Sequence, residues 1–197
     1  MIEIAIATED ALTETLAEII LQQSGLPFRI TQKFRRQGFG YLKGKISEFN
    51  QIARWHPVLV LTDLDQGECA PRLRRDWLRQ PPASKLLFRV AVRETEAWLL
   101  ADSEAFAAWI GVSAHSIPVV PDALPDPKQA LLRLVGKSHH RALKQDILPA
   151  RGARVAQGLG YNERLCCFVR ECWRAEVAAQ YSPSLARARR RVLELAG

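Results

Sequence analysis

Segments typical of β-strands and of α-helices alternate along the first half of the chain, and this order restricts the possible folds more than any other sequence feature. The strand-like runs occupy residues 2–7, 28–33, 58–63 and 86–92. Apolar residues at helical spacing lie over residues 11–24, 46–54, 70–78, 95–102 and 104–110. Strands separated by helices normally form a parallel sheet, because each crossover helix returns the chain to the same end of the sheet. We therefore predict an α/β fold with a Rossmann-like, mostly parallel sheet and flanking helices.

The character of the sequence changes after Gly111. A proline-rich stretch over residues 117–127 leads into segments that have helical spacing and no strand pattern. These segments are residues 128–136, 139–147, 151–158, 162–180 and 184–195. We therefore divide the chain into an α/β domain, residues 1–112, and an α-helical C-terminal extension, residues 113–197, that packs on it.

Acidic residues follow three of the predicted strands. Glu9 comes after the first strand, Asp63 and Asp65 come at the end of the third, and Glu94 follows the fourth. Open parallel sheets place their binding sites at the carboxyl ends of the strands. If the backbone stays extended, Asp63 and Asp65 point the same way, and carboxylates are the oxygen ligands that suit Mg²⁺ or Mn²⁺. We expect these four acids to bind such an ion; the alternative is that each caps a helix or lies in a solvated turn.

Two more acids are weaker candidates for the same site. Glu14, five residues after Glu9, could reach back to support a ligand or could be a solvated helix residue. Glu96 faces the site with Glu94 if the strand continues, and faces away from it if a helix has begun. Between the two, we favour Glu94 as the ligand.

The chain carries a formal net charge of +7 at pH 7, which favours a polyanionic partner such as nucleic acid. Residues 35–45 combine cations, glycines and aromatic residues, and we expect a loop there that contacts phosphates and bases. The alternative is a flexible, solvated loop. The expected nucleic-acid contacts are Arg36, Lys43, Lys45 and Lys137. A second group of cations, expected to be a solvated face of the last helix, comprises Arg187, Arg190 and Arg191.

The acidic stretches resemble known motifs. Residues 6–14, Ile-Ala-Thr-Glu-Asp-Ala-Leu-Thr-Glu, resemble the glutamate motif of Toprim domains, and Asp63-Leu64-Asp65 resembles their DxD motif. The chain as a whole resembles DUF4276, a bacterial family of Toprim-like proteins. The further stretches that carry this resemblance are Val-Arg-Glu-Thr-Glu-Ala-Trp-Leu-Leu-Ala-Asp at 92–102, Pro-Asp-Pro-Lys at 125–128 and Ser-Pro-Ser-Leu at 182–185.

The resemblance implies magnesium-dependent phosphodiester chemistry, because Toprim domains occur in topoisomerases, primases, a ribonuclease that matures ribosomal RNA and the OLD-type nucleases of phage defence. In that scheme Asp63 and Asp65 hold a metal ion, Glu9 is a ligand or a general acid/base, and Glu94 completes a second metal position. The OLD-type resemblance also implies an ATPase partner. Many Toprim proteins have glycine after the first glutamate, whereas this sequence has Asp10, so the turn there departs from the pattern.

The expected function is that of a divalent-metal-dependent nuclease acting on DNA or RNA, with phage defence as the implied setting. One alternative is a module that binds nucleic acid or an ATPase without catalysis, and another is a metal-dependent phosphatase acting on small phosphate esters. The sequence contains no GxxxxGK[ST], GxSxG or GxGxxG motif, which argues against P-loop nucleotide hydrolysis, serine hydrolase chemistry and nicotinamide chemistry.

The sequence also predicts the compartment and the state of the thiols. No apolar run approaches the ~20 residues that cross a bilayer, and the first residues lack the features of a signal peptide. We therefore expect a cytoplasmic protein without a membrane partner. The four cysteines, which lack metal-binding spacing, are expected to be free, buried thiols: Cys69, Cys166, Cys167 and Cys172.

Overall fold

The computed structural model describes residues 1–34, 38–150 and 152–196. Its centre is a four-stranded sheet in which every neighbouring pair is parallel, with the order β2-β1-β3-β4. The strands are β1 (Ile2–Thr8), β2 (Phe28–Phe34), β3 (Val58–Asp63) and β4 (Leu86–Ala91). The predicted α/β class and Rossmann-like parallel sheet are therefore confirmed.

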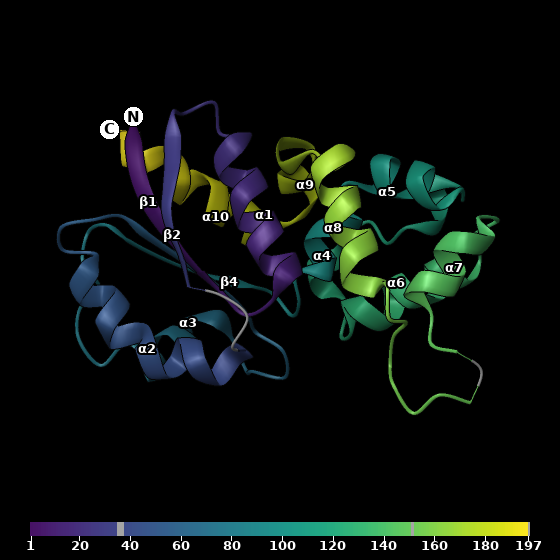
Figure 1. Ribbon diagram of the computed structural model, residues 1–197, viewed down its shortest axis with the longest axis horizontal. Coiled ribbons are helices and arrows are strands. Elements are labelled where there is room, and N and C mark those ends of the chain that lie inside the picture. Colours follow the sequence, from purple (N-terminus) through teal and green to yellow (C-terminus); the bar gives the residue numbers. More distant parts are fainter. Residues whose placement is uncertain (35–37, 151, 197) are drawn as a thin grey trace.

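Helices cover both faces of the sheet (Figure 1). The helices of the first half are α1 (Ala11–Gln22), α2 (Gly38–Ile52), α3 (Ala70–Trp77), α4 (Glu96–Ala101) and α5 (Ser103–Ile110). Side chains alternate across a strand, so Ile4 and Ile6 of β1 pack in the same cluster as α1 and α4, whereas Ala5 and Ala7 pack in the cluster that includes α2 and α3. The sheet therefore separates two hydrophobic cores.

The C-terminal part is helical and shares the first of these cores. Its helices are α6 (Pro127–Gly136), α7 (Arg141–Ile147), α8 (Tyr161–Glu171), α9 (Ala175–Tyr181) and α10 (Pro183–Leu193), with short 3₁₀ turns η1 (Ala114–Ser116), η2 (Pro121–Ala123) and η3 (Glu194–Ala196). Helix α8 packs on α1, α9 on α4, and α10 on the edge strand β4. The Trp98 indole N–H donates to Ser184 Oγ at 2.7 Å, so a buried hydrogen bond also connects the two parts.

Two of the predicted C-terminal helices are wrong. Residues 152–160 form turns and bends rather than a helix. A Cβ at Gly158 would lie 2.2 Å from the Asp146 carbonyl oxygen, so the chain there passes too close to α7 for any other residue. The predicted helix over 162–180 is divided into α8 and α9, because the Arg174 backbone N–H donates to the Asp102 carboxylate at 2.9 Å instead of continuing a helix.

The expected basic loop is wrong over residues 38–45, because α2 begins at Gly38, and residues 35–37 lie outside the described part of the chain. Leu42, Ile46 and Phe49 are buried at helical spacing against the sheet. Burying this stripe offsets the cost of glycine within a helix, about 1 kcal/mol for each residue. The helical spacing of these apolar residues is readable in the sequence, but the glycines of the segment favoured the prediction of a loop.

The thiol prediction holds in part. The four cysteines are free, and Cys166 is buried, but Cys69 and Cys172 are exposed. Within the described part of the chain, no helix is both long and apolar enough to cross a membrane.

The junction between the two parts depends on a buried carboxylate. Asp102 is fully buried, and its side chain accepts hydrogen bonds from the Arg174 guanidinium at 2.6 and 3.0 Å. We expect Arg174→Met to lower the free energy of unfolding by about 3 kcal/mol, because it leaves a buried charge without its counter-charge. Urea denaturation measures this, with Arg133→Met on exposed α6 surface as the matched control. Equal stability of the two variants would show that the ion pair contributes nothing at this junction.

Candidate functional site

The candidate site lies where the chain reverses its direction across the sheet. After β1 the chain moves outward to β2, and it then returns to form β3 on the other side of β1. Ligands of open α/β sheets bind at the carboxyl ends of the strands next to such a switch point. Glu9 follows the end of β1, and Asp63 is the last residue of β3, so both flank this position.

Glu9 is held against the neighbouring strand. Its Oε1 accepts a hydrogen bond from the Asp63 backbone N–H at 3.1 Å and another from the Thr62 hydroxyl. Burial raises the pKa of Glu9, which these two hydrogen bonds oppose, and the negative charges of Asp65 and Asp10 raise it further. The Asp10 side chain itself caps α1 by accepting from the Thr13 N–H at 2.8 Å. The departure from glycine at position 10 is thus explained by a helix cap.

Asp63 is the centre of the acidic group. Its Oδ1 accepts a hydrogen bond from the Thr95 N–H, 3.0 Å away, at the start of α4. Burial raises the pKa of Asp63 well above its ordinary value, and the negative charges of Glu96, Glu9, Asp10 and Asp65 add to the effect in that order. Carboxylates from three separate segments therefore lie close enough to oppose one another's ionisation.

Asp65 reaches the site from a turn and not from a strand. Strand β3 ends at Asp63, and Asp65 has φ of 49°, so the extended backbone expected between these two residues is wrong. The Arg93 carbonyl accepts from the Asp65 N–H at 2.8 Å, and the Arg93 guanidinium donates to the carbonyls of Asp65 and Gly67. Asp65 is exposed; partial burial of its carboxylate raises its pKa, and Lys128 lowers it.

Glu94 and Glu96 occupy different surroundings because α4 begins at Glu96. Glu94 Oε2 accepts from the Lys128 backbone N–H at 2.9 Å, in the first turn of α6. Glu96 is buried, and its Oε1 accepts from the Tyr161 hydroxyl at 2.6 Å. Burial raises the pKa of Glu96 to about 7, Tyr161 opposes this, and Glu94 adds to it. Of the two, Glu96 is the one whose charge acts on Asp63.

Glu14 and the expected nucleic-acid residues are placed differently. Glu14 is buried on α1 and forms an ion pair with Lys33 of β2, at 3.5 Å. Lys43 is exposed on α2, and Lys45 pairs with Glu48 at 2.8 Å. Lys137 follows α6 at the end opposite to Lys128, about 14 Å along the helix. Arg36 lies outside the described residues.

Two residues of the C-terminal part that contact the acids, Lys128 and Tyr161, were not predicted as site residues from the sequence. Lys128 donates its backbone N–H to Glu94, and its ammonium lies 5.0 Å from the centre of the Tyr161 ring. Asp126 caps α6 and Pro127 is its first residue. This cap signal was readable, but nothing in the sequence indicates which strand end α6 meets.

The chemistry of these donors suits Mg²⁺ or Mn²⁺, because they are carboxylate oxygens. The buried Thr8 hydroxyl, next to Glu9, has no hydrogen-bond partner among the described residues. In the same part of the chain, no three His, Cys, Asp or Glu side chains are grouped so that they could hold a metal ion. The donor types fit such an ion, and its binding would require the carboxylates to turn from their present hydrogen bonds.

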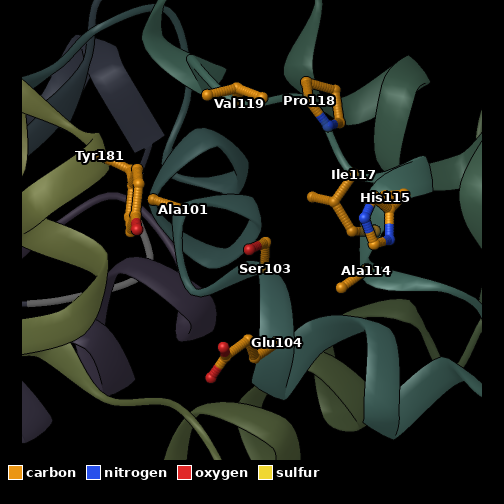
Figure 2. A pocket seen from close by; sticks show the side chains of 9 residues that line it. All are labelled: Ala101, Ser103, Glu104, Ala114, His115, Ile117, Pro118, Val119 and Tyr181. Atoms are coloured by element: carbon orange, nitrogen blue, oxygen red, sulfur yellow. The ribbon is translucent and has the colours of Figure 1, made fainter.

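A separate hollow of about 320 Å³ lies between α4, α5, η1 and α9 (Figure 2). Its lining includes Glu104, His115 and Tyr181, and none of the strand-end acids. The acidic group is therefore not part of this hollow.

The fold and the acidic edge define a Rossmann-like α/β protein with a carboxylate cluster at its switch point. The chain belongs to the family described as Domain of unknown function (DUF4276), whose model matches residues 7–156. That range contains the strand-end acids and Lys128, and it ends before Tyr161. Neither the search of curated proteins nor that of solved structures returned a match.

Proposed function

We propose that this protein is a Mg²⁺- or Mn²⁺-dependent nuclease acting on DNA or RNA. One observation carries the proposal: Glu9 accepts a hydrogen bond from the Asp63 N–H at 3.1 Å, and Asp63 accepts one from the Thr95 N–H at 3.0 Å, so acids of three segments converge at the switch point. The charges of Glu96 and Glu9 accordingly raise the pKa of Asp63. Packing like charges together costs stability. A divalent cation at this place would remove the repulsion, which supports a cation site.

The roles follow from position. Asp63 and Asp65 would hold the ion, Glu9 would be a further ligand or a general acid/base, and Glu94 or Glu96 would serve a second position. Such an ion, when bound, supplies positive charge that stabilises the attacking and leaving oxygens of a phosphodiester. The direction of the Glu9 pKa shift, upward through burial, favours a group that can hold and pass on a proton.

The basic character of the chain supports a polyanionic substrate. The net charge is +7 although the site itself is acidic, so the rest of the surface can attract nucleic acid. Lys128 brings a cation beside the carboxylates, since its charge acts on Asp65, Glu94 and Glu96. The resemblance to Toprim domains, and to OLD-type nucleases in particular, agrees with this proposal and adds an ATPase partner and phage defence as its setting.

We expect the purified protein to cleave labelled single- or double-stranded DNA or RNA when Mg²⁺ or Mn²⁺ is added, and to lose this activity in EDTA. The measurement is product length on a denaturing gel over time, with and without the candidate ATPase. Binding that survives EDTA without any cleavage would instead identify a binding module. Hydrolysis of mononucleotides in preference to polymers would identify a phosphatase.

A further inference from the structure

A second charged site lies on the edge strand, and none of the strand-end acids lines it. A hollow of about 280 Å³ between α3, β4 and α10 is lined by Arg74, Arg89 and Arg187. Its apolar floor includes Phe88 and Val90. Three segments that are far apart in the sequence therefore each contribute an arginine to one concave surface.

Two of these arginines, Arg74 and Arg89, are partly buried, which disfavours their charged form. The Nε–H of Arg74 is buried and has no acceptor among the described residues. Arg89 donates its own Nε–H to the Phe88 carbonyl at 2.7 Å. Burial, followed by the charges of Arg74 and Arg191, lowers the pKa of Arg89 to about 10, and burial and Arg191 lower the pKa of Arg74. The positive charges of these arginines thus repel one another at a site from which water is partly excluded.

The surrounding acids do not neutralise this cluster. Glu194 is the acid whose charge acts on Arg89, and it forms ion pairs with Arg190 and Arg191 outside the hollow. In the described part of the chain no carboxylate forms an ion pair with Arg74, Arg89 or Arg187. A partly buried group of unpaired guanidinium ions is characteristic of a site that an anion completes.

We propose that Arg74, Arg89 and Arg187 bind a phosphate group. Guanidinium N–H groups pair with phosphate oxygens through two parallel hydrogen bonds, and several arginines around one hollow favour a tetrahedral anion with several oxygens. The buried, unsatisfied Nε–H of Arg74 is the donor that this ligand would satisfy. The site requires no metal ion and no cleavage, so it goes beyond the proposed nuclease function.

The position of the hollow favours a phosphate of a nucleic-acid strand as the source. Arg89 is two residues before the end of β4, where Ala91 pairs with Asp63 of β3. Arg89, which lines the hollow, is therefore about 7 Å along the strand from the residue that pairs with Asp63. A polynucleotide lying along this side of the sheet could place one phosphate among the arginines and another near the carboxylates.

The test measures binding by isothermal titration calorimetry in EDTA, so that its result does not depend on a metal ion or on cleavage. The probes are inorganic phosphate and a short single-stranded oligonucleotide. We expect Arg74→Gln to weaken binding about tenfold or more, while Arg75→Gln, an exposed position on the same helix, leaves it unchanged. Arg187→Gln, at the exposed rim, is expected to weaken binding as well and cannot disturb the core.

The two probes separate the two sources of phosphate. Arg74-dependent binding of both probes supports a site for which the phosphate group alone is sufficient. Arg74-dependent binding of the oligonucleotide alone supports a site for a polynucleotide backbone. The proposal is overturned if wild-type protein binds neither probe, or if Arg74→Gln, Arg187→Gln and Arg75→Gln all bind as wild type does.

Discussion

Replacing Asp63 by asparagine is expected to abolish metal-dependent cleavage, with a loss of about a thousandfold or more, because the substitution removes the central negative charge of the cation site. The fold should survive, since an asparagine Oδ1 can still accept the hydrogen bond from the Thr95 N–H. The measurement is the cleavage rate of an oligonucleotide at saturating Mn²⁺, together with Mn²⁺ affinity from calorimetry.

Asp76→Asn is the matched control. Asp76 is exposed on α3 and is not among the charges that act on Glu9, Asp63 or Glu96, so the same chemical change there should leave both cleavage and Mn²⁺ affinity unaltered. Mn²⁺ affinity of Asp63→Asn equal to that of wild type would show that this carboxylate does not hold the ion. Near-normal cleavage by Asp63→Asn would remove the acidic edge from the proposed chemistry.

Replacing Glu96 by glutamine is expected to stabilise the metal-free protein at pH 8, by up to roughly 3 kcal/mol. Burial raises the pKa of Glu96 from 4.5 to about 7. The folded protein therefore holds the proton more tightly than the unfolded chain does, and it loses stability as the pH rises from about 4.5 through about 7. Glutamine carries no charge and avoids this loss, while its amide oxygen can still accept from the Tyr161 hydroxyl.

The measurement is the free energy of unfolding in urea with EDTA, at pH 5 and at pH 8. Glu96→Gln should exceed wild type at pH 8 and by much less at pH 5. Adding Mg²⁺ at pH 8 should raise the stability of wild type more than that of the variant, because the cation relieves the same repulsion. Glu163→Gln, exposed on α8, is the control. A pH-independent difference between Glu96→Gln and wild type would contradict this account of the buried carboxylate.

The regular elements of the sheet were predictable because their signals are local. A buried strand such as β3 needs an uninterrupted apolar run, and a helix such as α1 needs apolar residues at helical spacing, so both patterns are readable in the sequence. The parallel order then brings Glu9 and Asp63 to one edge of the sheet. The N-terminal part of helix α2 was missed, because the glycines there outweighed a buried stripe whose value depends on the sheet beneath it, whereas its second half was predicted as a helix.

The surroundings of the acids were not predictable in the same way. The backbone of Asp65 turns at φ of 49°, and two hydrogen bonds with Arg93 hold this turn: the Asp65 N–H donates to the Arg93 carbonyl, and the Arg93 guanidinium donates to the Asp65 carbonyl. Whether Glu94 or Glu96 faces Asp63 depends on where α4 begins. Thr95 donates its backbone N–H to the Asp63 carboxylate, and α4 begins at the next residue, Glu96. Such contacts connect residues that no periodic pattern relates.

By itself, the order of residues determined that this chain forms a parallel α/β sheet and that acids gather where its strands end, because side-chain periodicity and strand direction follow from local backbone geometry. Only the tertiary structure decided that α6 and α8 bring Lys128 and Tyr161 to the carboxylates. It likewise decided that arginines of α3, β4 and α10 surround one hollow. These groups meet through the packing of distant helices, and the energy of that packing depends on shape and burial across the whole core and not on spacing within any one segment.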